Sequence, residues 1–327
     1  MRGAILVCLL LLGSCARPDT KPRLRVAVLA GSLGHLPLYL AHSLGYFAEE
    51  GLDVHMEELS STSKTMEAVL GGSVEIGAST YEQVLQMTAA GGSVKSFFVL
   101  ALRPTQVLVV SPRRPDIRRI EDLRGKTVGI TSLGSATQSV LSRLLLNHGM
   151  TLADVTAVGI GSSGSAVAAV EHGKVDAALL ISLAFEQLRA RSPGVTVLLD
   201  ARTAEGCTEL FGVPAVVGSG VVATPRWLTE NGTTARKVTR ALARAAKWIQ
   251  DQSLADVHRR LPTALRSPES AADLHALRVM RPSLSQDGRM PPEGPARAAA
   301  FLRSVGHTNL PTDLSPTYTE EFLEIKP

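Results

Sequence analysis

Small hydroxyl-bearing residues and glycines recur where an apolar run of the chain ends and a helical pattern begins. Hydroxyl groups and the free backbone N–H groups of a helix start attract an anion or a polar head group. We therefore expect these positions to bind a small solute: Ser32, Ser60, Ser61, Thr62, Ser79, Thr80, Ser132, Gly134, Ser135, Thr137 and Ser182. A helix-capping role is the alternative for Ser79, for Thr80 and for Ser135, which forms a capping-box pattern with Gln138.

Two ionisable side chains accompany these hydroxyls. His35 follows the first apolar run, where it either contacts a ligand or lies on the surface at a helix start; we favour contact. Arg103 precedes Pro104 at the end of a predicted strand. Its guanidinium could pair with an anionic ligand, although a solvated loop arginine explains it equally well.

The sequence predicts no catalytic residue, metal site or cofactor. It contains no HExxH, GxSxG, P-loop or zinc-spaced Cys/His pattern. The GxGxxG at residues 159–164 lacks the acid that a dinucleotide site needs after the next strand, where Ser182 stands instead. Adjacent carboxylates such as Glu49 and Glu50 point apart, so they do not form a catalytic pair.

The elements that must position these residues alternate between strand and helix. Short β-branched runs and helical patterns follow one another, with strands at 24–30, 53–59, 74–78 and 96–102 and helices at 37–50 and 81–90. This order predicts an α/β lobe with a mainly parallel sheet. The pattern restarts near residue 107 and becomes largely helical after Pro225, where residues 233–251 carry one apolar stripe.

We therefore expect two doubly wound α/β lobes joined by a two-strand hinge, with a helical C-terminal segment. Residues 24–109 and 219–327 form lobe I, and residues 110–218 form lobe II. The similar runs at 106–111 and 218–224 would be the crossing strands of the hinge. Two independent domains are the alternative.

The first fifteen residues have the pattern of an export signal. Arg2 precedes an apolar run at 4–12 that is too short to cross a bilayer, which needs about 20 helical residues. The run ends in Leu12-Gly13-Ser14-Cys15, which resembles a bacterial lipobox. The resemblance implies a lipid on Cys15, a tether at 16–23, and a membrane-anchored protein on the periplasmic or cell-surface side. An ordinary signal that happens to contain a cysteine is the alternative.

Composition narrows the class of partner. The chain has 34 Lys and Arg against 30 Asp and Glu, scattered along its length, so nucleic-acid binding is not indicated. No later run is long and apolar enough to span a bilayer. Beyond Cys8 and Cys15 the only cysteine is Cys207, so the mature protein has no internal disulfide.

Seven short segments between residues 35 and 177 together resemble one family. They are HLPLY at 35–39, GYF at 45–47, GLDV at 51–54, GSVEIG at 72–77, DLRGKTVG at 122–129, GSAT at 134–137 and GKVDA at 173–177. In this order and spacing they are similar to the solute-binding proteins for nitrate, sulfonates, taurine and thiamine precursors. The resemblance implies the type II periplasmic-binding fold, a ligand in the cleft between the lobes, and a membrane permease as partner.

Two departures limit what the resemblance implies. Many sulfonate binders carry a tryptophan and an Asp-Pro pair where this chain has LISLA at 180–184, which puts sulfonate specificity in doubt. The cysteine-rich cluster of the related eukaryotic thiamine-pyrimidine synthases is missing, so the enzyme branch has no support here. We expect a monomeric solute-binding component of an ABC importer that captures a small organic or anionic solute of the nitrate, sulfonate or thiamine-precursor class. A small-metabolite enzyme and a ligand-sensing lipoprotein are the alternatives.

Overall fold

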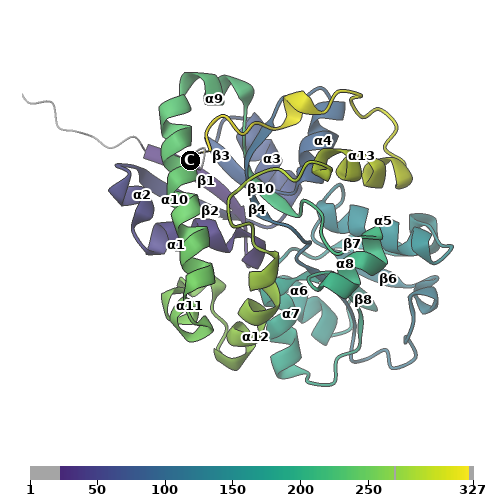
Figure 1. Cartoon of the computed structure of the whole chain (residues 1–327). Coiled ribbons are helices and arrows are strands. Elements are labelled where there is room, and N and C mark those ends of the chain that lie inside the picture. Colours follow the sequence, from purple (N-terminus) through teal and green to yellow (C-terminus); the bar gives the residue numbers. More distant parts are fainter. Residues whose placement is uncertain (1–22, 269, 324–327) are drawn as a thin grey trace, which may run out of the picture.

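The computed structural model describes residues 23–268 and 270–323, and it contains two lobes, each built on a mixed five-stranded sheet (Figure 1). The first sheet has the order β2-β1-β3-β10-β4, with β1 Arg23–Leu29, β2 Asp53–Leu59, β3 Ile76–Ser79, β4 Lys95–Ala101 and β10 Ser219–Ala223. The second has the order β7-β6-β8-β5-β9, with β5 Gln106–Val110, β6 Thr127–Ile130, β7 Thr156–Gly159, β8 Ala177–Ile181 and β9 Val197–Asp200. The two-lobed α/β prediction is confirmed.

Helices cover both sheets. In the first lobe they are α1 Leu36–Ser43, α2 Tyr46–Glu49, α3 Thr62–Leu70 and α4 Tyr81–Ala89. In the second they are α5 Ala136–Asn147, α6 Gly164–Glu171, α7 Ser182–Arg191 and α8 Ala204–Phe211. The C-terminal segment adds α9 Pro225–Glu230, α10 Gly232–Asp251, α11 Leu254–Arg260, α12 Ser270–Met280 and α13 Gly294–Ser304. Short 3₁₀ turns lie at Leu33–His35, Ile120–Leu123, Leu152–Asp154, Thr263–Leu265, Arg281–Ser283 and Ser315–Thr317.

Each sheet contains one strand that runs against its neighbours. Strand β10 lies antiparallel between β3 and β4, and β5 lies antiparallel to both β8 and β9. Both sheets are therefore mixed, and the other four strands of each run in one direction, in keeping with the expected mainly parallel sheet. The two runs expected to be shared crossing strands are instead full members of one sheet each.

The hinge lies slightly earlier in the chain than expected. Strand β5 pairs within the second sheet, so residues 106–109 belong to the second lobe and not to the first. The outward crossing occupies residues 102–105, between β4 and β5. The returning segment lies beside it, because Val216 N donates to Leu102 O at 2.9 Å and Gly218 N donates to Ala101 O at 2.9 Å.

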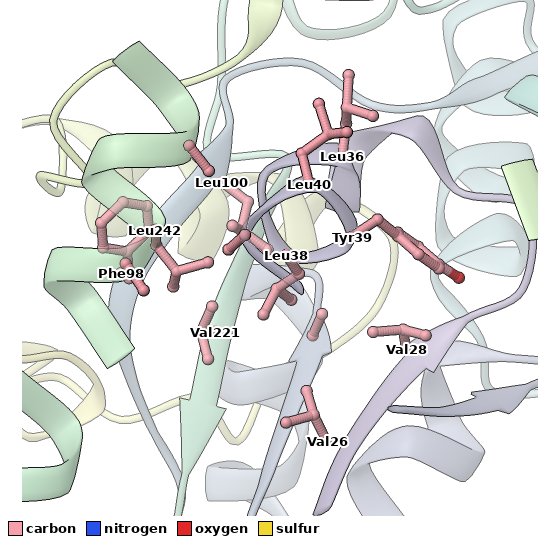
Figure 2. Close-up of a cluster of buried hydrophobic side chains, with 14 of the residues drawn as sticks. Val26, Val28, Leu36, Leu38, Tyr39, Leu40, Phe98, Leu100, Val221 and Leu242 are labelled. Atoms are coloured by element: carbon pink, nitrogen blue, oxygen red, sulfur yellow. The ribbon is translucent and has the colours of Figure 1, made fainter. Parts of the chain in front are cut away.

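The core of the first lobe forms where α1 and α10 cover the sheet (Figure 2). Val26 and Val28 of β1 face Leu38 of α1, and all three are fully buried. Helix α10 adds a stripe that includes Leu242, so the expected apolar face of this helix is confirmed. Within the described ranges, no helix is long and apolar enough to cross a membrane.

Three local expectations need correction. The helix expected at 37–50 is divided into α1 and α2, because Gly45 takes the left-handed conformation with φ 79°. Helices α7 and α8 were not predicted. The C-terminal segment, assigned to lobe I alone, contacts both lobes: α12 packs against α7, and α13 packs against α4 and α5.

Candidate functional site

Loops at the carboxyl ends of strands in both sheets meet at the interface between the lobes. Thr62 Oγ1 accepts a hydrogen bond from Ala136 N at 3.3 Å, which joins the starts of α3 and α5. Gln83 Nε2 donates to Gly134 O at 3.1 Å. These contacts across the interface show that the two lobes are closed on each other.

The closed interface surrounds a cavity of about 20 Å³ beside the hinge. Both lobes, both crossing segments and α13 contribute to its lining, which is Leu29, Ser32, His35, Thr62, Thr80, Glu82, Pro104, Thr105, Gln106, Ala136, Ser139, Val140, Phe211, Gly218, Ser219 and Phe301. This volume is room for about one water molecule. An organic solute therefore requires the lobes to separate before it can enter.

His35 lies on the cavity as the sequence predicted. The side chain is buried within the 3₁₀ turn Leu33–His35, and its Nδ1 has no hydrogen-bond partner among the described residues. Burial lowers the pKa of His35 to about 3, so the imidazole is neutral. A neutral imidazole offers one N–H donor and one lone pair to whatever fills the cavity.

Glu82 is a cavity residue that the sequence analysis missed. It is in the first turn of α4 and only 8% exposed. Burial raises the pKa of its carboxyl to about 7, although its own backbone N–H and the Thr80 hydroxyl act in the opposite direction. An acidic residue in the first turn of a helix is ordinarily exposed to water, where it interacts favourably with the helix dipole. Only burial distinguishes Glu82 from such a surface residue.

The other missed lining residues include polar and aromatic side chains. Gln106 and Ser219 begin the two antiparallel strands β5 and β10, and Ser139 lies on α5. Phe211 of α8 and Phe301 of α13 contact each other edge to face with ring centres 5.0 Å apart. No local sequence pattern identifies this aromatic pair, because the two residues are 90 positions apart in the chain and only the tertiary fold brings them together.

The predicted hydroxyls divide into two groups. Ser32, Thr62 and Thr80 line the cavity with His35, whereas the other predicted residues do not. Ser61 caps α3 by accepting from Lys64 N at 3.3 Å. Ser79 is buried next to Thr80, and its Oγ has no partner among the described residues.

The remaining predicted residues mostly stabilise the loops around the cavity. Ser182 Oγ donates to Thr105 O at 3.2 Å, and Thr137 Oγ1 accepts from Thr131 N at 2.9 Å. Ser132 Oγ lies 3.0 Å from Ser63 Oγ across the interface. Ser60 is partly exposed directly after β2.

At two positions the observed hydrogen bonds differ from a role that the sequence suggested. Arg103 directs its guanidinium to backbone carbonyls, with Nε 3.0 Å from Pro214 O, and it does not line the cavity. Ser135 makes no side-chain cap; its Oγ instead donates to Ser132 O at 2.6 Å. Gln138 accepts from Gly134 N at 2.8 Å, so the proposed capping box is not formed.

Known proteins similar to this chain include both binding proteins and enzymes. A family model described as NMT1/THI5 like matches residues 32–253, more than half of the chain. The chain is 28% identical to the 4-amino-5-hydroxymethyl-2-methylpyrimidine phosphate synthase of Aspergillus parasiticus over 66% of its own length, and it spans 63% of that synthase. It is 27% identical to the riboflavin-binding protein RibY of Chloroflexus aurantiacus, with 94% of this chain and 88% of RibY covered.

Solved structures share the whole two-lobed architecture. A protein of Bordetella bronchiseptica RB50 matches with a TM-score of 0.85 and 28% identity, covering 93% of this chain and 96% of its own. The alkanesulfonate-binding protein SsuA of Xanthomonas axonopodis pv. citri, bound to MOPS, matches with a TM-score of 0.73 and 19% identity, covering 91% and 98%. This chain therefore belongs to the NMT1/THI5-like family and has the type II periplasmic-binding-protein fold.

Proposed function

We propose that this protein is the solute-binding component of an ABC importer, which captures a small organic solute between its lobes and delivers it to a membrane permease. The observation that carries the proposal is the cavity at the hinge, to which both lobes contribute buried polar groups. The binding proteins among its relatives support the same function.

Capture requires that the closed state bind the solute better than the open state. A ligand shifts such an equilibrium only by its difference in affinity for the two states, so it must contact both lobes. His35 and Glu82 come from the first lobe, whereas Ser139 and Phe211 come from the second. A solute that touches both groups would stabilise the closed arrangement that a permease can recognise.

An enzymatic function is the second candidate, because pyrimidine phosphate synthases are among the relatives and two titratable side chains line the cavity. His35 is neutral, and the pKa of Glu82 is close to physiological pH, so proton transfer would be chemically feasible. A captured solute that mass spectrometry recovers unchanged after incubation favours transport, and a time-dependent product favours the enzyme.

The binding function predicts stabilisation by a solute of the right class. We expect the full-length purified protein to gain about 4 kcal/mol of unfolding free energy when the ligand is at 1,000 times its dissociation constant. Thermal unfolding checks this with compounds extracted from the native protein and with a panel of nitrate, taurine, aminopyrimidines and riboflavin. If no compound raises the melting temperature, the proposed function fails.

The lipid anchor on Cys15 lies outside the described residues and is proposed here on the sequence alone. Strand β1 begins at Arg23, which leaves a short segment between Cys15 and the folded body. We expect Cys15→Ser to abolish incorporation of labelled palmitate and to release the protein from the membrane fraction. Replacement of Cys207, which is buried, is the matched control and should leave labelling intact. Retention of label by Cys15→Ser would contradict the anchor.

A further inference from the structure

We propose that His275 and Glu186 form a latch that holds the two lobes together in the ligand-free protein. His275 lies on α12 of the C-terminal segment, and Glu186 lies on α7 of the second lobe. His275 Nδ1 is 3.1 Å from Glu186 Oε1. The proposal concerns the lobes without a solute, so it can fail while the proposed function stands.

The two helices of the latch belong to different lobes. Helix α12 contributes Leu277 to the core of the first lobe, whereas α7 contributes Phe185 to the apolar cluster around the second sheet. The two helices lie side by side (Figure 1). Separation of the lobes would therefore draw His275 away from Glu186.

Glu186 also has arginine partners in its own lobe. Its side chain is fully buried, with Arg202 at 2.9 Å and Arg189 at 2.7 Å. When α12 moves away, the carboxylate therefore keeps two cations and is not left as an unpaired buried charge, the situation that is most unfavourable. The lobes can part without breaking the arginine pairs.

His275 adds one hydrogen bond to this cluster. A carboxylate only accepts, so Nδ1 of His275 is the donor. One hydrogen bond shifts an equilibrium by about 3- to 10-fold. The contact therefore favours the closed arrangement without preventing the lobes from opening.

This preference matters because the closed cavity has a volume of only about 20 Å³. Such a cavity admits about one water molecule, so an organic solute enters only when the lobes are apart. A contact that stabilises the empty closed state reduces the fraction of molecules that can accept a solute. The latch would therefore set how readily the ligand-free protein opens.

Hydrogen exchange on the ligand-free full-length protein tests the latch. The backbone N–H of Ala136 begins α5 and donates across the interface to Thr62 Oγ1 at 3.3 Å. The first N–H groups of a helix have no acceptor within it, so exchange at this amide reports separation of the lobes. We expect His275→Ala to accelerate this exchange by about 3- to 10-fold. Small-angle scattering should show a larger radius of gyration.

His258→Ala is the matched control. His258 Nε2 lies 3.1 Å from Oδ2 of the buried Asp273, so the chemistry is the same, but α11 and α12 carry both residues within the C-terminal segment. This variant should leave exchange at Ala136 unchanged. His275→Asn should return the exchange rate toward that of the wild type, because its amide N–H group replaces Nδ1 of the imidazole.

The outcomes decide the proposal without any knowledge of the solute. The His275 side chain is 37% exposed, so we expect its variants to fold, and circular dichroism checks this. Unchanged exchange at Ala136 in His275→Ala, or equal acceleration in His258→Ala, would overturn the latch. No recovery in His275→Asn would show that the hydrogen bond to Glu186 is not what holds the lobes together.

Discussion

Replacing Arg202 by methionine is expected to lower the free energy of unfolding by about 3–5 kcal/mol, the usual cost of removing one partner from a buried ion pair. Arg202 is fully buried beside β9, and its guanidinium lies over the ring of Phe185 at 4.8 Å. It bonds to Asp200 at 2.7 Å and to Glu186 at 2.9 Å. Methionine would replace much of the volume but would leave the fully buried Glu186 with only the part-exposed Arg189 and His275 as partners.

Arg189→Met is the matched control for Arg202→Met. Arg189 bonds to the same Glu186 at 2.7 Å, but its side chain is 36% exposed. Glu186 keeps the fully buried Arg202 when Arg189 is removed, and a part-exposed arginine contributes little through its ion pair, so this variant should lose much less stability than Arg202→Met. Urea denaturation followed by circular dichroism measures both. Similar small losses in the two variants would show that burial does not strengthen the Arg202 pair.

Gly218→Ala is expected to have the second-largest effect, because Gly218 lies where the returning segment passes the outward one. A Cβ at this position would lie 2.0 Å from the carbonyl oxygen of Arg103. Backbone atoms cannot move away as a flexible side chain can, so the crossing segments must separate. We expect a loss of about 3 kcal/mol in unfolding free energy, at the upper end of the range for overpacking, together with a change in lobe closure.

Two measurements test the Gly218→Ala prediction. Denaturant unfolding should show the loss of stability, and small-angle scattering should show a larger radius of gyration than the wild type if the closed arrangement is disturbed. Gly194→Ala is the control, because no atom lies within 4 Å of its Cβ position and we expect a change below about 0.5 kcal/mol. Equal stability of the two variants would mean that the crossing segments are not closely packed in solution.

The fold was predictable where the sequence has a regular hydrophobic periodicity. Strand β2 occupies residues 53–59 as expected, because its pattern alternates and helical patterns flank it. Helix α10 was predictable because one face is apolar and the other charged. Helix α7 was not, because it buries apolar residues such as Phe185 together with the charged Glu186, and this removes the contrast between its faces.

The candidate site was predictable in its place but not in its chemistry. Hydroxyls after strands indicate loops at the carboxyl edge of a sheet, and Thr62 and Thr80 do lie on the cavity. Whether a charged residue faces the cavity depends on side-chain direction and on packing from distant elements. Arg103 donates to Pro214 O and Glu82 lines the cavity, and neither placement is encoded in the spacing of residues along the chain.

The position of strand β10 also determines the order in which the two lobes can be completed while the chain is synthesised or exported from its N-terminus. The second sheet is built from residues 106–200, so all its strands are available before residue 219 appears. The first sheet stays divided until Ser219–Ala223 inserts between β3 and β4. During vectorial synthesis or export, the first lobe therefore begins to form first but is completed last. The edges of β3 and β4 that pair with β10 must stay unpaired until the second lobe and then β10 have been synthesised or exported.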